Sequence, residues 1–197
     1  MKILVSGCCG FIGIHTCIKL LELGHDVIGI DNFNDYYDPQ IKYDRYELIK
    51  NDIDVINGKI EDEKIYDILP KVDLIIHLAA QAGVRYSLIN PQSYINSNIL
   101  GSFKLIDFAK KCECEKFIYA SSASVYGKNK IPWNEDMNLS NPISLYGATK
   151  IAFELIADSY FEMFGLKSIG LRFFSAYGPW GRPDLSLWKW TEGILKK

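Results

Sequence analysis

A glycine-rich turn between a short strand and an amphipathic helix constrains this sequence more than any other feature. Lys2–Ser6 (KILVS) is short, apolar and typical of a strand, and Phe11–Leu23 has helical spacing of its apolar residues and stops at Gly24. The turn between them reads GCCGFIG over residues 7–13. Glycines at this spacing permit a tight turn, let the backbone approach a pyrophosphate and let the helix pack on the strand, while the helix N-terminus favours phosphate. The turn therefore predicts a dinucleotide site whose members are Gly7, Gly10, Phe11, Ile12 and Gly13.

The rest of the chain alternates further strand and helix patterns. The strand candidates are Asp26–Ile30, Asp52–Asn57, Asp73–Leu78, Glu115–Ser121 and Lys167–Phe173. Helical patterns lie between most of them, including one from Pro91 through Ala109. Phe33–Pro39 and Lys128–Leu145 are polar and indicate loops. This order predicts an α/β fold of the Rossmann type, with a doubly wound parallel sheet and helices on both faces.

Composition excludes several functional classes. Hydrophobic residues make up 48% and charged residues 23% of the 197 residues, and the net charge is −2, which is typical of a globular protein. Because no run of Lys and Arg is present, we expect no nucleic-acid partner. No stretch is apolar for the 18 or more residues of a membrane helix. The glycine spacing explains the N-terminus better than a signal peptide does, and we expect a cytoplasmic protein.

The cysteines indicate free thiols. The five cysteines do not form two CxxC pairs, and histidine is scarce, so we expect no metal site. An odd count in a cytosol-like composition argues against disulfides. Cys8 and Cys9 are interpreted as small residues in a tight loop, with redox sensing as the alternative.

Asp31 ends the second predicted strand, 18 residues after Gly13. A carboxylate at this position can accept both hydroxyls of the adenosine ribose and would repel a 2′-phosphate, which favours NAD over NADP. The alternative is an ordinary aspartate in the turn after a strand.

Two further segments predict a proton-transfer site. Tyr146 and Lys150 open a helical stretch and lie on one face because they are four residues apart. A neighbouring ammonium and a positive nicotinamide ring would lower the phenol's pKa of about 10 and yield a base near neutrality. Upstream, YASSASVYG (residues 119–127) follows a strand, and a serine there can bind the same hydroxyl. The alternatives are a surface Tyr, a solvated Lys and a polar turn.

Several segments together resemble a known family. GCCGFIG, HLAA (residues 77–80), SSASVYG and YGATK, with Asp31, resemble the extended short-chain dehydrogenase/reductase family, which includes the NAD-dependent epimerases and dehydratases. Within it, IDNFNDYYDP, HLAAQAGVRYS, SLYGATK and LRFFSAYGPWGRPD are similar to UDP-glucuronate 4-epimerases, over almost the whole chain. The resemblance implies an isomerase of nucleotide-sugar metabolism that binds NAD and a UDP-sugar.

The resemblance also implies roles by position. Tyr146 would be the base, Lys150 its partner and Ser122 the hydrogen-bonding serine. The cofactor would be bound by Gly7, Gly10, Phe11, Ile12, Gly13, Asp31, Asn32, Ile60, Ala79, Ala80, Gln81, Tyr146 and Lys150, with Asn98 behind the site. The substrate would be bound by Arg85, Ser124, Ser175 and Arg182.

The implied chemistry is inversion at C4 of UDP-glucuronate to give UDP-galacturonate. Tyr146 would accept the C4 hydroxyl proton while hydride passes to NAD+, the 4-keto sugar would turn over, and hydride would return to its other face. Because a 4-keto uronate is a β-keto acid that loses CO2 readily, Arg182 and Ser175 would hold the carboxylate. The related dehydratases carry Asp-Glu where this chain has Ala123 and Ser124, and glucuronate decarboxylases carry Glu in place of Ser124.

The chain departs from the family in two places. The family's usual Gly-Asp after the third strand is Gly58-Lys59 here, and Lys59 cannot accept a hydrogen bond from adenine. Family members are also longer. We therefore expect an NAD-binding domain over residues 1–183, the start of a truncated substrate domain over residues 184–197, and weak or no activity of this chain alone. A binding module without turnover, an epimerase of neutral UDP-hexoses and a homodimer remain open.

Overall fold

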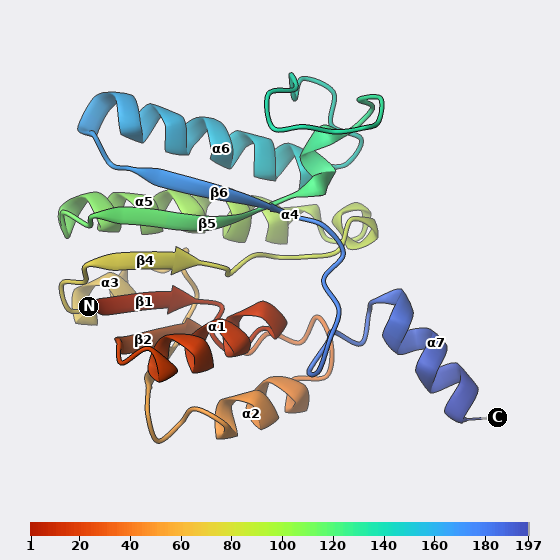
Figure 1. Ribbon diagram of the computed structural model, residues 1–197, viewed down its shortest axis with the longest axis horizontal. Coiled ribbons are helices and arrows are strands. Elements are labelled where there is room, and N and C mark those ends of the chain that lie inside the picture. Colours follow the sequence, from red (N-terminus) through yellow and green to blue (C-terminus); the bar gives the residue numbers. More distant parts are fainter. Residues whose placement is uncertain (197) are drawn as a thin grey trace.

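The computed structural model describes residues 1–196 and shows one parallel sheet of six strands (Figure 1). The strands lie in the order β3-β2-β1-β4-β5-β6, and every neighbouring pair is parallel. Their bounds are β1 Lys2–Ser6, β2 Asp26–Asp31, β3 Asp54–Asn57, β4 Leu74–His77, β5 Lys116–Ser122 and β6 Ser168–Phe173. The predicted doubly wound Rossmann-type fold is confirmed.

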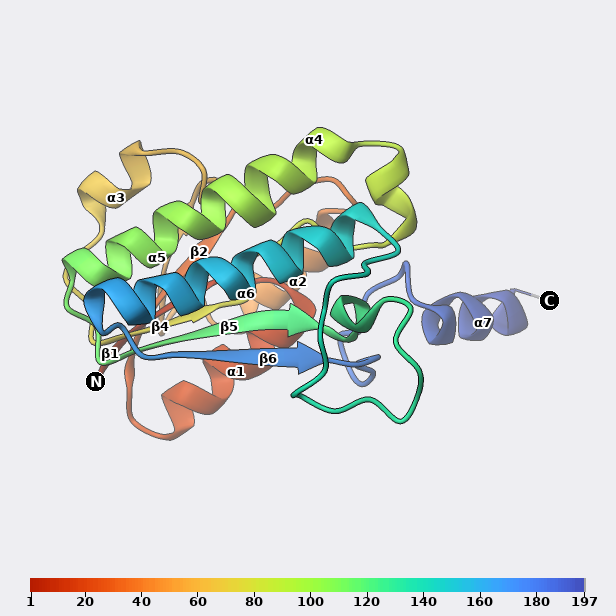
Figure 2. The same cartoon turned by 90° about the horizontal axis from the view of Figure 1, so that it is seen from above.

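Helices cover both faces of the sheet. The helices are α1 Phe11–Glu22, α2 Gln40–Glu47, α3 Lys64–Ile68, α4 Pro91–Tyr94, α5 Ser102–Lys111, α6 Leu145–Phe164 and α7 Ser186–Leu195. Seen from above in Figure 2, α5 and α6 run side by side over one face, and α1 lies on the other. The short turn η1 (Arg85–Leu88) precedes α4, and the short turn η3 (Ala123–Tyr126) follows β5.

The core consists of two clusters, one on each face, because successive side chains of a strand point to opposite faces. In β1, Leu4 packs with residues of α3, α5 and α6, whereas Ile3 and Val5 pack with Ile14 and Cys17 of α1. All of these side chains are buried. A strand buried on both faces has to be apolar throughout, which explains the KILVS pattern.

The helix predicted from Pro91 through Ala109 is interrupted. Pro91 does begin α4, and the Asn90 side chain caps it by accepting a hydrogen bond from the Ser93 N–H at 3.3 Å. A π-helical segment, η2 (Ile95–Gly101), then separates α4 from α5. A single-sequence pattern does not reveal this widened turn, because its apolar spacing stays close to that of an α-helix.

The C-terminal helix α7 has no buried residue and lies apart from the sheet in Figure 1. Its large apolar side chains include Trp190, which is 68% exposed, and Ile194, which is 72% exposed. The predicted domain boundary between residues 183 and 184 stays a prediction. Among the residues described, no helix is long and apolar enough to cross a membrane.

Candidate functional site

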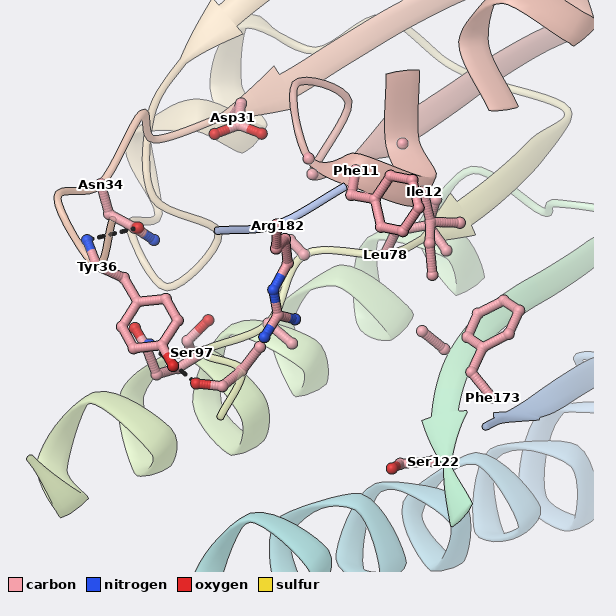
Figure 3. Close-up of a pocket in the computed structure, with 18 of the residues that line it drawn as sticks. Phe11, Ile12, Asp31, Asn34, Tyr36, Leu78, Ser97, Ser122, Phe173 and Arg182 are labelled. Atoms are coloured by element: carbon pink, nitrogen blue, oxygen red, sulfur yellow. Dashed lines mark hydrogen bonds between the residues drawn. The ribbon is translucent and has the colours of Figure 1, made fainter. Parts of the chain in front are cut away.

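A single cleft runs along the carboxyl ends of the strands, where β1 has β2 on one side and β4 on the other. Open α/β sheets place their ligands at such a switch point. Figure 3 shows Asp31 and Ser122 at opposite ends of the cleft, with the side chain of Arg182 pointing into the space between them. Thus, segments separated by more than a hundred residues in sequence line one space.

The glycine-rich turn forms the floor of the cleft and is packed too closely for side chains. A Cβ on Gly13 would lie 1.9 Å from the carbonyl oxygen of Gly7, and one on Gly7 would lie 2.8 Å from the nitrogen of Ala79. Gly7 also has a φ of +74°, which favours glycine. Gly10 precedes α1 without a side-chain cap, so the first N–H groups of the helix remain available to a phosphate. The predicted residues Gly7, Gly10, Phe11, Ile12 and Gly13 all line the cleft.

The Asp31 carboxylate lies at the ribose end of the predicted dinucleotide site. Its two oxygens accept hydrogen bonds from the N–H groups of Cys9 at 3.1 Å and Phe33 at 3.0 Å, which fix its orientation. The Lys42 ammonium lies 3.8 Å away and donates to the Asn34 side chain at 3.0 Å. Burial lowers the pKa of Lys42, and Asp31 acts in the opposite direction.

Lys42 was not predicted from the sequence. Its side chain is buried and lines the cleft together with Asn34, Tyr36 and Tyr37 of the preceding loop, which are partly buried. A charged residue in a polar segment after β2 is normally solvated, so only the fold shows that α2 brings this ammonium inward.

The opposite wall of the cleft comes from the loops after β3 and β4. Ile60, Ala79, Ala80 and Gln81 line the cleft there as predicted, whereas Lys59 does not. Asn32, directly after β2, also lines the cleft as predicted. Asn98 of η2 lies behind this wall, as expected. Its side chain accepts from the Gln81 N–H at 2.8 Å and donates to the Gln81 carbonyl at 3.1 Å and to the Thr149 hydroxyl at 3.2 Å. The π-helical turn thus positions the loop after β4 against α6.

Tyr146, Lys150 and Ser122 meet at the other end of the cleft. The Ser144 side chain caps α6 by accepting from the Gly147 N–H at 3.0 Å, which fixes the start of the helix that carries the Tyr and Lys. The Lys150 ammonium donates to the Ala120 carbonyl at 2.9 Å and lies 5.9 Å from the centre of the Tyr146 ring.

Burial dominates the protonation of this pair. It raises the pKa of Tyr146, while the Ser122 hydroxyl and the Arg182 guanidinium act in the opposite direction. It also lowers the pKa of Lys150 to about 8, although the negative charge of Glu154 acts to raise that pKa. The predicted lowering of the Tyr146 pKa is therefore not produced by the protein groups alone, because desolvation outweighs them.

A partly buried ion pair beside Lys150 was not predicted from the sequence. Glu154, one helical turn after Lys150, pairs with Arg172 of β6 through two hydrogen bonds of 3.1 and 2.9 Å, and the Ser121 hydroxyl also donates to it. The sequence held one indication of this pair: Glu154 follows Lys150 by four residues and therefore lies on the same face of the helix. Its partner in β6 could not be identified without the register of the sheet.

Arg182 and Ser175 line the cleft, as predicted for the substrate side. The Nε and Nη2 atoms of Arg182 bind Asp184 at 2.9 and 2.6 Å, and the Tyr36 hydroxyl donates to the same carboxylate at 3.1 Å. Burial would raise the pKa of Asp184, but its bonds to Arg182 outweigh burial, and the pKa is lowered. This side-on pairing holds the guanidinium in place without using Nη1.

Two predicted substrate residues do not line the cleft. Arg85 lies in η1 and is exposed. Ser124 lies in η3, where its N–H donates to the Ser122 hydroxyl at 3.1 Å. The structure therefore connects Ser124 to the site through Ser122 and shows no such connection for Arg85.

The chain is similar to known proteins over almost its whole length. The family model described as the NAD dependent epimerase/dehydratase family matches residues 3–193. The chain is 46% identical to the protein CapI of Staphylococcus aureus over 99% of its own length and 60% of that protein. It is 46% identical to UDP-glucuronate 4-epimerase 6 of Arabidopsis thaliana, over 99% of the chain and 44% of that enzyme.

A solved structure is similar over the whole chain. It is the UDP-glucuronic acid 4-epimerase of Bacillus cereus in complex with UDP-glucuronic acid and NAD, with a TM-score of 0.94 and 34% identity, over 100% of this chain and 63% of that one. The chain thus spans less than two thirds of the length of these relatives.

Proposed function

The chain belongs to the NAD-dependent epimerase/dehydratase family, and from this premise we propose that the protein is a UDP-sugar 4-epimerase that uses NAD and acts on UDP-glucuronate. One observation carries the proposal: the glycine-rich turn with Asp31, the Tyr146–Lys150 pair and Arg182 all line the same cleft. The similarity to a UDP-glucuronic acid 4-epimerase over the whole chain supports it. Because the chain covers only part of these relatives, the proposal concerns the activity of the whole protein.

The residues of the cleft fit NAD. The tight turn at Gly7 and Gly13 leaves backbone where a pyrophosphate would lie, and Asp31 would accept the hydroxyls of the adenosine ribose. Ile60 and the segment Ala79–Gln81 would flank the cofactor. When bound, NAD supplies the acceptor for the C4 hydride of the sugar and returns that hydride to the opposite face.

Tyr146 would hold and move the proton of the C4 hydroxyl. The phenol is partly buried beside Ser122, whose hydroxyl can bind the same sugar oxygen. Lys150 keeps a positive charge near the ring below pH 8 and is held by the Ala120 carbonyl. A nearby cation favours the phenolate, which is the form that accepts the proton.

Arg182 and Ser175 would bind the carboxylate of the substrate. Because Asp184 uses only the Nε side of the guanidinium, Nη1 is left for a second carboxylate. A bidentate or charge-assisted bond to that group would favour a uronate over a neutral hexose and would restrain the carboxylate of the 4-keto sugar, which is prone to leave as CO2.

The proposal is tested by incubating the whole protein with NAD and UDP-glucuronate and identifying the product by NMR. We expect UDP-galacturonate, and no conversion of UDP-glucose under the same conditions. Conversion of UDP-glucose alone would refute the uronate assignment. NAD binding without conversion of either sugar would favour the second candidate, a binding module without turnover.

A further inference from the structure

The cysteine pair of the glycine-rich turn lies directly beside Asp31. The Sγ atoms of Cys8 and Cys9 are 3.8 Å apart, and both lie within 4.8 Å of a carboxylate oxygen of Asp31. Both thiols are fully buried, and Asp31 is 6% exposed. The Cys8 sulfur fits against β2 because residue 29 is glycine, where a Cβ would lie 2.6 Å from that sulfur. The fold therefore gathers three ligand groups of the kind that soft metal ions bind.

The spacing of the two sulfur atoms matches a metal site. Two thiolates bound to one zinc ion at about 2.3 Å with a tetrahedral angle lie about 3.8 Å apart. The observed separation of Cys8 and Cys9 is 3.8 Å, so the pair can hold such an ion without moving apart. Asp31 can supply the third ligand. Adjacent cysteines do not always meet this condition, since their side chains often point in opposite directions.

We propose that Cys8, Cys9 and Asp31 form a binding site for one thiophilic divalent cation of the zinc and cadmium class, and that this ion and NAD exclude each other. The exclusion rests on the proposed cofactor site, because Asp31 belongs both to that site and to the cation site. A cation bound to the Asp31 carboxylate takes the lone pairs that would otherwise accept from the ribose hydroxyls, while the N–H groups of Cys9 and Phe33 hold the carboxylate in either role. The ion would thus inactivate the protein that lacks cofactor.

Binding is an exchange of protons for metal. One divalent cation displaces one proton from each thiol and forms two metal–sulfur bonds, so affinity rises with pH. The hydrogen bond from one thiol to the other, and then burial, hold the pKa of Cys8 well above its usual value. The charged and titratable groups that face this site are Asp31 of β2, Lys42 and Arg45 of α2, and Cys17 of α1.

Access to the thiols depends on opening of the turn. Neither sulfur reaches solvent, and the Arg45 guanidinium holds the Cys9 carbonyl at 3.1 Å. A pyrophosphate bound to the turn would keep it closed, so NAD protects the thiols in addition to competing for Asp31. The expectation of no metal site rested on the spacing of the cysteines and the scarcity of histidine, and it did not consider Asp31, which is 22 residues from Cys9.

The test uses Cd2+ as the probe on protein freed of nucleotide. Calorimetry and the ultraviolet charge-transfer absorption of Cd–thiolate bonds should show one ion bound to two thiolates, with affinity rising between pH 6 and pH 8. At an NAD concentration 100 times its own dissociation constant, the apparent Kd for Cd2+ should rise about 100-fold. Cys8→Ala with Cys9→Ala should abolish binding, whereas the matched double variant Cys112→Ala with Cys114→Ala should retain it.

Three results would overturn the inference: no thiolate absorption, absorption that survives in the Cys8→Ala, Cys9→Ala variant, or a Cd2+ affinity that NAD does not change. That variant should still bind NAD, which shows that it folds. A protein that converts UDP-glucuronate but takes up no Cd2+ refutes only the metal site. A protein that binds Cd2+ but not NAD refutes the exclusion together with the proposed cofactor.

Discussion

Lys150 should reduce the stability of the protein, and Lys150→Met should reveal by how much. Burial lowers its pKa from 10.5 to about 8. Below pH 8 the lysine is charged in both the folded and the unfolded chain, and the lowered pKa then costs about 3 kcal/mol of folding free energy, at about 1.36 kcal/mol for each tenfold change in proton affinity. Methionine removes this cost but leaves the Ala120 carbonyl without its 2.9 Å partner, at about 1 kcal/mol. The variant should therefore be about 2 kcal/mol more stable at pH 7.

The size of the effect should change with pH. Between pH 8 and 10.5 the unfolded chain binds the proton more tightly than the folded protein, so the stability of the wild type rises with pH in this window. At pH 10 most of the cost is gone, and Lys150→Met should lose most or all of its advantage. At pH 7 the expected gain corresponds to a Tm higher by about 4–8 °C for a chain of this size.

Urea unfolding of the nucleotide-free protein at pH 7 and pH 10 measures both values. Lys19→Met is the matched control, because Lys19 is exposed and pairs only with Glu22, and it should change little at either pH. If Lys150→Met destabilises the protein equally at both pH values, the ammonium is not desolvated in the way that the structure indicates, and the reasoning fails.

Three other variants test the site. Tyr146→Phe should lower the rate of epimerisation by about 100-fold or more while leaving the Kd for NAD nearly unchanged, measured by NMR and titration; normal turnover would exclude the phenol as the base. Gly13→Ala should cost about 1–3 kcal/mol in urea unfolding and abolish NAD binding, since its Cβ would lie 1.9 Å from the Gly7 carbonyl oxygen. Asp184→Asn should lower the preference for UDP-glucuronate over UDP-glucose about tenfold, mainly through KM, because Arg182 loses a charge-assisted pair. An unchanged preference in competition assays would show that Asp184 does not position Arg182.

Much of the cofactor end of the site could be predicted because its signals are local. The turn at residues 7–13 joins a strand to a helix directly, and Asp31 ends the next strand. In a parallel sheet, the carboxyl ends of neighbouring strands lie at one edge, so their closing residues meet. Tyr146 and Lys150 share a face through helical geometry alone.

Contacts that depend on the path of the chain could not be predicted in this way. The pairing of Glu154 with Arg172 requires the position of β6 beside β5, and the pairing of Asp184 with Tyr36 brings together residues 148 positions apart. The interruption of the helix after α4 also depends on tertiary contacts, because Asn98 of η2 forms hydrogen bonds with Gln81 and Thr149.

The amino-acid sequence by itself determined the layered α/β fold, the phosphate turn and the positions of the principal polar groups, because glycine spacing and apolar periodicity act over a few residues. Only the tertiary structure decided which of these groups lose water and which neighbours they meet. Burial gives Lys150 its lowered pKa, and the return of β2 beneath the turn brings Asp31 to Cys8 and Cys9. Desolvation and long-range proximity follow from the packing of the whole chain, which no local pattern encodes.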